Sequence, residues 1–282
     1  MVSVLIDAFI DTLKLIPYLF LTFLILEFLE HKISQKMQSK LFKYKKIGPL
    51  VGGVMGGFPQ CGFSAMAANL YTARVITMGT LIAVFLSTSD EMLPIMISEN
   101  APIELMVGAV LLKIVVGVII GFLVDFILRK KVVKNERRIK EICKNEHCHC
   151  EEKGIVWSSA KHTLKTLVFV LCANLLIGLA IYFVGIDSLA NALNNGNVLV
   201  YFMASLVGLI PNCAASIMLT EIYLGGIISF GTLIAGLLTS AGIGILLLLK
   251  SNKNWKENLK ILAIVYFVGV VTGVAVDLLI VF

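Results

Sequence analysis

The sequence predicts an all-α polytopic membrane protein with about ten membrane segments, arranged as two inverted-topology repeats with discontinuous or re-entrant helices. Of the 282 residues, 58% are hydrophobic and 15% are charged, whereas soluble domains are about 45–50% apolar and about 25% charged. Several apolar runs of roughly 20 residues follow one another, each long enough to cross a bilayer. Uncommon residues also recur at a constant offset. This composition excludes a soluble enzyme, a nucleic-acid-binding protein and a disordered protein.

The first predicted segment runs from about residue 4 to residue 29. It begins with the acidic residues Asp7 and Asp11 and lacks a small-residue cleavage site, which predicts a retained helix rather than a cleaved signal peptide. In the stretch that follows, 31–46, lysines alternate with apolar residues. This pattern predicts an interfacial helix bound to anionic membrane lipids.

The central block, 47–97, contains two interruptions in its apolar sequence. The first is a glycine-rich run that ends in Pro59, and the second is the polar run 87–94. Because the two repeats are predicted below to be inverted in the membrane, the block must cross it an odd number of times. This can occur as three short crossings or as one crossing with a re-entrant hairpin. A helix over 102–128 is predicted to complete the first half.

The chain divides into a first repeat (1–128), a basic link (129–161) and a second repeat (162–282). Pro59-Gln60-Cys61 recurs 152 positions later as Pro211-Asn212-Cys213. The same offset pairs Ser64 with Ser216, Met66 with Met218, Tyr71 with Tyr223, the run 79–83 with 231–235, and Gly117, Gly121 and Asp125 with Gly269, Gly273 and Asp277. Proline, cysteine, tyrosine and aspartate are too uncommon in apolar sequence for this agreement to arise by chance, so it indicates an internal duplication.

Basic residues lie on opposite sides of the two predicted repeats. Lysines are frequent in 31–46 and absent from the equivalent stretch 185–197, whereas 98–104 has only acidic charge and its equivalent 250–260 is basic. Cytoplasmic loops carry the excess of lysine and arginine. The repeats are therefore predicted to be inverted in the cell membrane, with 31–46, 129–161 and 250–260 cytoplasmic and both termini outside.

Polar residues gather at the interruptions, where transporters with inverted repeats bind their substrates. Asp90 and Glu91 stand out, because an intramembrane carboxylate costs about 3 kcal/mol unless it is paired, protonated or metal-bound. The alternative is that both lie at a helix end near the outer surface. The predicted substrate or metal residues are Gln60, Cys61, Ser64, Asn69, Ser87, Ser89, Asp90, Glu91, Asn212, Cys213, Ser216, Glu221, Thr239 and Ser240.

The donor types at these positions favour a divalent cation. Carboxylate, amide and hydroxyl oxygens suit manganese, and the nearby thiols and thioethers favour a transition metal over calcium or magnesium. Helix N-termini could instead hold an anion, with Arg74 or Lys113 as the counter-charge. Lys113 could also neutralise an acid. The residues alone leave the sign of the substrate charge open.

The link between the repeats holds a second group of candidate ligands, Cys143, His147, Cys148, His149 and Cys150. Thiolates and imidazoles bind zinc, copper(I) or cadmium, and thiols stay reduced in the cytosol. The spacing is not that of a zinc finger, so incidental cysteines in a basic loop are the alternative. We predict an accessory cytoplasmic metal site.

Several of these motifs resemble one known family. The runs 57–64, 69–71, 74–77, 79–83 and 87–94 are similar to those of the ten-helix heavy-metal exporter family, often labelled manganese transporters and grouped with arsenic-permease-like proteins. The resemblance extends over nearly the whole chain and implies metal efflux. It supplies no established ligand set.

The predicted function is therefore that of a secondary transporter that exports a divalent transition metal, with manganese favoured, in exchange for protons. Its partners would be the metal ion and membrane lipids, without nucleic acid or a required cofactor, and a homo-oligomer is compatible with the sequence. The absence of a Walker motif gives direct ATP use no support. The alternatives are a transporter of an arsenical or organic anion, a membrane thiol oxidoreductase using Cys61 and Cys213, and a metal sensor.

Overall fold

The computed structural model describes residues 47–58, 61–88, 92–128, 155–184 and 198–281, together with 12, 13, 16, 17, 19–21, 23 and 24. All of the regular structure in these residues is helical. The predicted interfacial stretch 31–46, most of the link 129–161 and the loop 185–197 lie outside the described residues.

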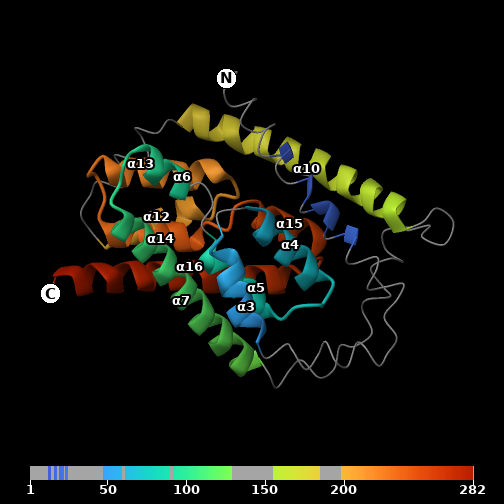
Figure 1. The fold of residues 1–282 in the computed structure, drawn as a ribbon, viewed down its shortest axis with the longest axis horizontal. Helices are drawn as coiled ribbons and strands as arrows, with labels where there is room; N and C mark the ends of the chain where they lie inside the picture. The colour runs from blue at the N-terminus through green and yellow to red at the C-terminus, as the bar shows by residue number, and fades with distance from the viewer. Residues whose placement is uncertain are drawn as a thin grey trace.

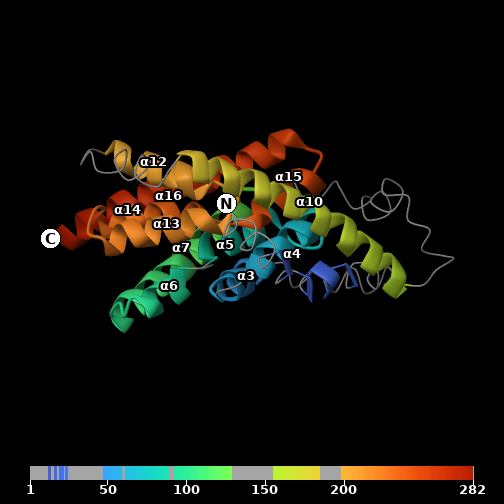
Figure 2. The same ribbon diagram turned by 90° about the horizontal axis from the view of Figure 1, so that it is seen from above.

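The helices of the first half are α3 (Gly48–Gly56), α4 (Cys61–Thr72), α5 (Met78–Ser87), α6 (Met92–Ser98) and α7 (Ile103–Leu128). Those that follow are α10 (Ile155–Val184), α12 (Leu199–Gly208), α13 (Cys213–Leu224), α14 (Phe230–Thr239), α15 (Ile243–Ser251) and α16 (Trp255–Val281). Helix α10 lies along one side of the assembly (Figures 1 and 2). It begins at Ile155, before the predicted end of the link at 161, because the apolar run Ile155-Val156-Trp157 already continues into the helix.

The bounds of the five helices α12 to α16 match those of α3 to α7 to within one residue when shifted by 152 positions. For α4 and α13, and for α5 and α14, the match has no deviation. The helix breaks that separate α3 from α4 and α5 from α6 therefore have counterparts at 209–212 and 240–242. The predicted interruptions of the apolar sequence are interruptions of helices.

Equivalent caps begin the short helices α5 and α14. The hydroxyls of Thr77 and Ser229 accept hydrogen bonds from the backbone N–H groups of Thr80 and Thr232, each at 3.1 Å. Such caps satisfy amides that have no partner within a helix. After α14 the chain turns at Gly242, whose φ of 52° and ψ of −137° are available almost only to glycine.

Close contacts at small residues show the relative direction of neighbouring helices. Gly48 lies against Thr80 and Gly56 against Ser87, so α3 and α5 run parallel. The chain must therefore reverse between them, and α4 returns in the opposite direction. In the second half, the Ser205 hydroxyl donates to the Ala235 carbonyl at 3.3 Å and Gly208 lies against Thr239.

Helices α7 and α16 run antiparallel to α5 and α14. Gly79 contacts Gly121, and Gly117 contacts the carbonyl of Ala83, so residue numbers fall along α7 as they rise along α5. In the second half, Gly231 contacts Gly273 in the same way. The backbones approach closely because glycine has no side chain at these crossings, a packing mode common between membrane helices.

The two halves interlock through α4 and α15. Gly244 packs against the backbone of Ser64, and the Ser251 hydroxyl donates to the Asn69 side-chain carbonyl at 3.4 Å, so these helices run parallel. Helix α6 lies against α13 in the equivalent arrangement. Figure 1 shows both pairs, α4 beside α15 and α6 beside α13.

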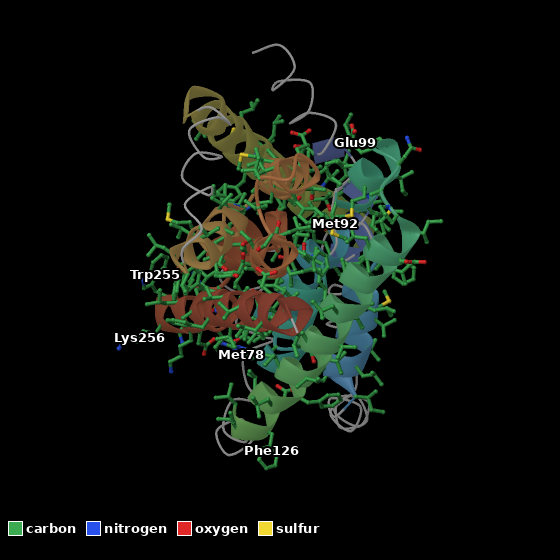
Figure 3. The ribbon with its side chains drawn as sticks, turned by 90° about the vertical axis from the view of Figure 1, so that its left-hand side faces the viewer. Met78, Met92, Glu99, Phe126, Trp255 and Lys256 are labelled. Carbon is green, nitrogen blue, oxygen red and sulfur yellow. The ribbon has the colours of Figure 1, made fainter. Side chains whose placement is uncertain are left out.

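The outer faces of the long helices are apolar. Stretches Met78–Ser98, Ile103–Leu128, Phe230–Ser251 and Trp255–Leu279 are long and apolar enough to cross a bilayer. Phe126 and Trp255 point outward and are 74% and 66% exposed, whereas Met92 lies fully buried among the helices (Figure 3). Because large apolar side chains face outward, the surface of these helices is suited to lipid rather than water.

Candidate transport site

The two helix breaks of each half lie side by side. Gly56, at the end of α3, contacts the Ser87 hydroxyl at the end of α5. Gly208, at the end of α12, contacts the Thr239 hydroxyl at the end of α14 in the same way. In each half, the connection between two short helices (α3 and α4, or α12 and α13) therefore lies beside the interruption of a membrane-spanning stretch, which follows α5 or α14. Broken helices of this kind expose backbone groups that can bind an ion.

Buried polar residues surround these breaks. At most 9% of each side chain is exposed for Ser64, Ser87, Thr88, Asn212, Ser216, Thr239 and Ser240. All of these except Thr88 were predicted site residues, and they lie around the ends of short helices. The buried thiol of Cys213 lies with them at the start of α13.

Most of these hydroxyls hydrogen-bond to helix carbonyls. Ser87 donates to Ala83 at 2.8 Å, and Ser216 donates to Cys213 at 2.8 Å. Thr239 donates to the Ser205 carbonyl at 2.9 Å and so joins α14 to α12. These residues therefore hold the helices together in addition to any role toward a substrate.

Ser240 differs from the other hydroxyls. It caps the C-terminus of α14 and is only 2% exposed, yet its oxygen has no hydrogen-bond partner among the described residues. A buried hydroxyl without a partner costs about 1–3 kcal/mol, and native structures rarely leave one.

Lys113 brings a positive charge to the break in the first half. Its side chain is buried within α7, and its ammonium donates to the carbonyl of Thr88, the C-cap of α5. An ammonium at a helix C-terminus is favourable because the last carbonyls carry partial negative charge. Next in the chain come Ser89, Asp90 and Glu91, which lie outside the described residues.

Other predicted residues lie elsewhere or outside the description. Asn69 faces Ser251 near the far end of α4, and its amide nitrogen is buried without a partner among the described residues. Glu221 is exposed on α13, eight residues or about 12 Å beyond the start of that helix. Cys61 begins α4, but its side chain is not among the described ones. The remaining predicted residues lie outside the described residues: Gln60, Cys143, His147, Cys148, His149 and Cys150.

The described residues contain no group of three histidine, cysteine, aspartate or glutamate side chains that could hold a metal. Of the three carboxylates in the predicted ligand group, Glu221 is within this set, whereas Asp90 and Glu91 lie outside it.

Two aspartates that hydrogen-bond to the starts of α5 and α14 were not predicted as functional residues. They are Asp125 of α7 and Asp277 of α16. Asp125 accepts hydrogen bonds from the Thr77 hydroxyl at 2.6 Å and the Gly79 amide at 2.9 Å. Asp277 accepts from the Ser229 hydroxyl, the Gly231 amide at 2.7 Å and the Tyr201 hydroxyl at 2.7 Å. Their recurrence at the repeat offset was the sequence signal for a shared role. That role is to tie the long helix of each half to the start of its broken helix.

A polar cluster joins the two halves at the turn after α4. Arg74 forms a 2.8 Å ion pair with Glu257 of α16, and the Tyr71 hydroxyl donates to the same carboxylate at 3.3 Å. Burial alone would lower the pKa of Arg74, but the hydrogen bond and charge of Glu257 raise it above its ordinary value. The residues 152 positions away from Arg74 and Glu257 are Gly226 and Leu105, so this ion pair has no counterpart at the repeat offset.

Comparison with known protein families finds a match along the chain. A family described as "Putative, 10TM heavy-metal exporter" matches residues 1–187, 138–229 and 185–280. These overlapping matches together extend over almost all of the sequence. No curated protein and no solved structure matches it.

Proposed function

Because the chain belongs to the family described as "Putative, 10TM heavy-metal exporter", we propose that it is a secondary transporter that exports a divalent transition metal, with manganese as the favoured ion. Membership confirms the resemblance predicted from the sequence. It makes the protein a multi-pass membrane transporter and not an enzyme, so a thiol oxidoreductase function for Cys61 and Cys213 is no longer considered.

The observation that carries this proposal is the pairing of two broken-helix units that run in opposite directions. Helix α4 is antiparallel to α5 but parallel to α15, which continues the direction of α14 within one apolar stretch. Helices α5 and α14 thus point in opposite directions. This arrangement supports inverted repeats, with α3–α4 and α12–α13 as re-entrant hairpins and one crossing beside each.

In such transporters the substrate lies where the broken helices of the two repeats meet, and the repeats rock around it. We place the metal at the breaks, near Ser87, Thr239 and the run 89–91. Asp90 and Glu91 would supply the negative charge, because a divalent cation in a low-dielectric site requires anionic ligands. Exchange with protons follows if the same carboxylates take up protons after the metal leaves.

Substitution of Asp90 by asparagine tests this placement. We expect Mn²⁺ efflux from proteoliposomes to fall by about 10–100-fold. Substitution of a residue that only orients a metal ligand lowers metal affinity or activity by about this factor, and loss of the ligand itself should have at least the same effect. Glu104→Gln is the matched control, because Glu104 is an exposed acid at the start of α7. Unchanged efflux and an unchanged pH dependence in Asp90→Asn would contradict the assignment.

The same vesicles distinguish the metal from the anion alternative. We expect saturable flux of Mn²⁺ and competition by other divalent transition metals, without flux of arsenite or citrate. Flux of an anion alone would reverse the assigned charge of the substrate.

The ion pair between Arg74 and Glu257 is expected to keep one face of the repeat interface closed. The basic stretch 250–260 predicts that this face is cytoplasmic. Loss of the pair in Arg74→Gln should raise the labelling rate of Ser251→Cys by a membrane-impermeant maleimide about 5–30-fold, equivalent to about 1–2 kcal/mol of lost closure. The measurement requires a background in which the six native cysteines are replaced.

The charge-swapped double variant Arg74→Glu/Glu257→Arg is the control for this gate. It should restore the low labelling rate, because the attraction survives with its signs exchanged. Equal labelling in the parent and in Arg74→Gln would show that the ion pair does not control access.

A further inference from the structure

The two halves differ at a buried position that, in the first half, contributes to a helix break. Lys113 donates its ammonium to Thr88 at the C-terminus of α5. The residue 152 positions later is Val265, which is fully buried on α16. The first half therefore carries its own cation at this helix end, whereas the equivalent valine in the second half brings none.

The equivalent helix end in the second half is that of α14. Its C-cap is Ser240, the counterpart of Thr88, and helix C-termini leave their last carbonyls without partners inside the helix. The Thr88 hydroxyl is satisfied by the Val84 carbonyl at 2.7 Å. The buried Ser240 hydroxyl has no partner among the described residues. Two features therefore coincide at this position, a carbonyl-rich helix end and an unsatisfied oxygen.

We propose that the C-terminal end of α14 binds a small monovalent cation at the position equivalent to the Lys113 ammonium, with the hydroxyl and carbonyl oxygens of Ser240 among its ligands. This inference rests on the proposed equivalence of the two repeats. It adds to the proposed function a second ion, bound at the break that follows α14, whose gradient would drive export.

The chemistry of the ligands selects the class of ion. Hydroxyl and carbonyl oxygens are hard, neutral donors, which suit an alkali cation better than a transition metal. Neither donor is an acid that takes up and releases a proton near neutral pH, so the ion bound here would not be a proton. The ammonium that occupies the equivalent place in the first half carries a single positive charge. Sodium is therefore the first ion to test.

Thermal unfolding of the purified full-length protein in detergent tests the site without requiring transport. Addition of Na⁺ at saturating concentration is expected to raise the Tm by about 5 °C relative to choline at equal ionic strength. Ser240→Ala should weaken this response by removing one ligand. Val265→Lys should abolish the response, because its ammonium would occupy the site as Lys113 does in the first half.

Val265→Leu is the matched control, since it enlarges the side chain without a charge and without reaching the place of the ion, and it should keep the Na⁺ response. The proposal is overturned if the parent protein shows no Na⁺-specific shift, which would leave Ser240 bonded to water. It is also overturned if Val265→Lys folds and responds to Na⁺ like the parent. A failure of Mn²⁺ flux with the Na⁺ shift intact would instead contradict the proposed function alone.

Discussion

Replacement of Asp277 by asparagine is expected to destabilise the protein by about 2–4 kcal/mol. The carboxylate accepts hydrogen bonds from Ser229, Gly231 and Tyr201, and it stands at the start of α14, where the helix dipole favours a negative charge. Asparagine keeps the shape of the side chain but replaces one acceptor oxygen by a donor, which then faces another donor. Thermal unfolding in detergent should show a fall in Tm of about 5–10 °C.

The duplication provides an internal comparison for this prediction. Asp125→Asn should have a similar effect, because Asp125 accepts hydrogen bonds from the equivalent hydroxyl and amide, those of Thr77 and Gly79. Glu104→Gln, on the exposed surface of α7, should leave the Tm unchanged. If both aspartate variants unfolded like the parent protein, these carboxylates would not be structural ties, and a role in ion binding would have to be considered.

The helix breaks could be predicted from the sequence because their signals are local. Proline removes a backbone donor and glycine permits sharp turns, so interruptions near Pro59 and Pro211 were visible in single segments. The direction of the helices was not local information. It depends on which glycine meets which partner across the interface, as Gly244 meets Ser64.

The arrangement of the site residues was harder to predict than the breaks, for a physical reason. Residue type indicates what a side chain can bind but not which way its helix turns it. Glu221 follows Ser216 by five residues, which is roughly 140° around a helix, and so it lies exposed while Ser216 is buried. Conversely, Asp125 and Asp277 appeared only as markers of the duplication, because the partners described for them lie 46 to 76 residues away in the sequence.

Substitution of Lys113 by valine is the second change for which we expect a large effect. It makes the first half like the second at this position, since the equivalent residue is Val265. The loss of the buried ammonium leaves the Thr88 carbonyl without its donor. It would also remove the charge that balances Asp90 and Glu91, if these carboxylates lie at the same break as we propose. Removal of one member of a buried charged group costs about 3–5 kcal/mol, so both the Tm and Mn²⁺ efflux should fall.

The response of Lys113→Val to added ions separates the two roles of this lysine considered from the sequence. If Lys113 balances the acids and the helix end, Na⁺ should restore part of the lost stability by taking the vacated place. Combination with Asp90→Asn should also cost less than the sum of the two single changes, because the double variant no longer leaves one charge alone. If Lys113 instead holds an anionic substrate, Na⁺ would leave Lys113→Val unchanged and binding of the anion would disappear.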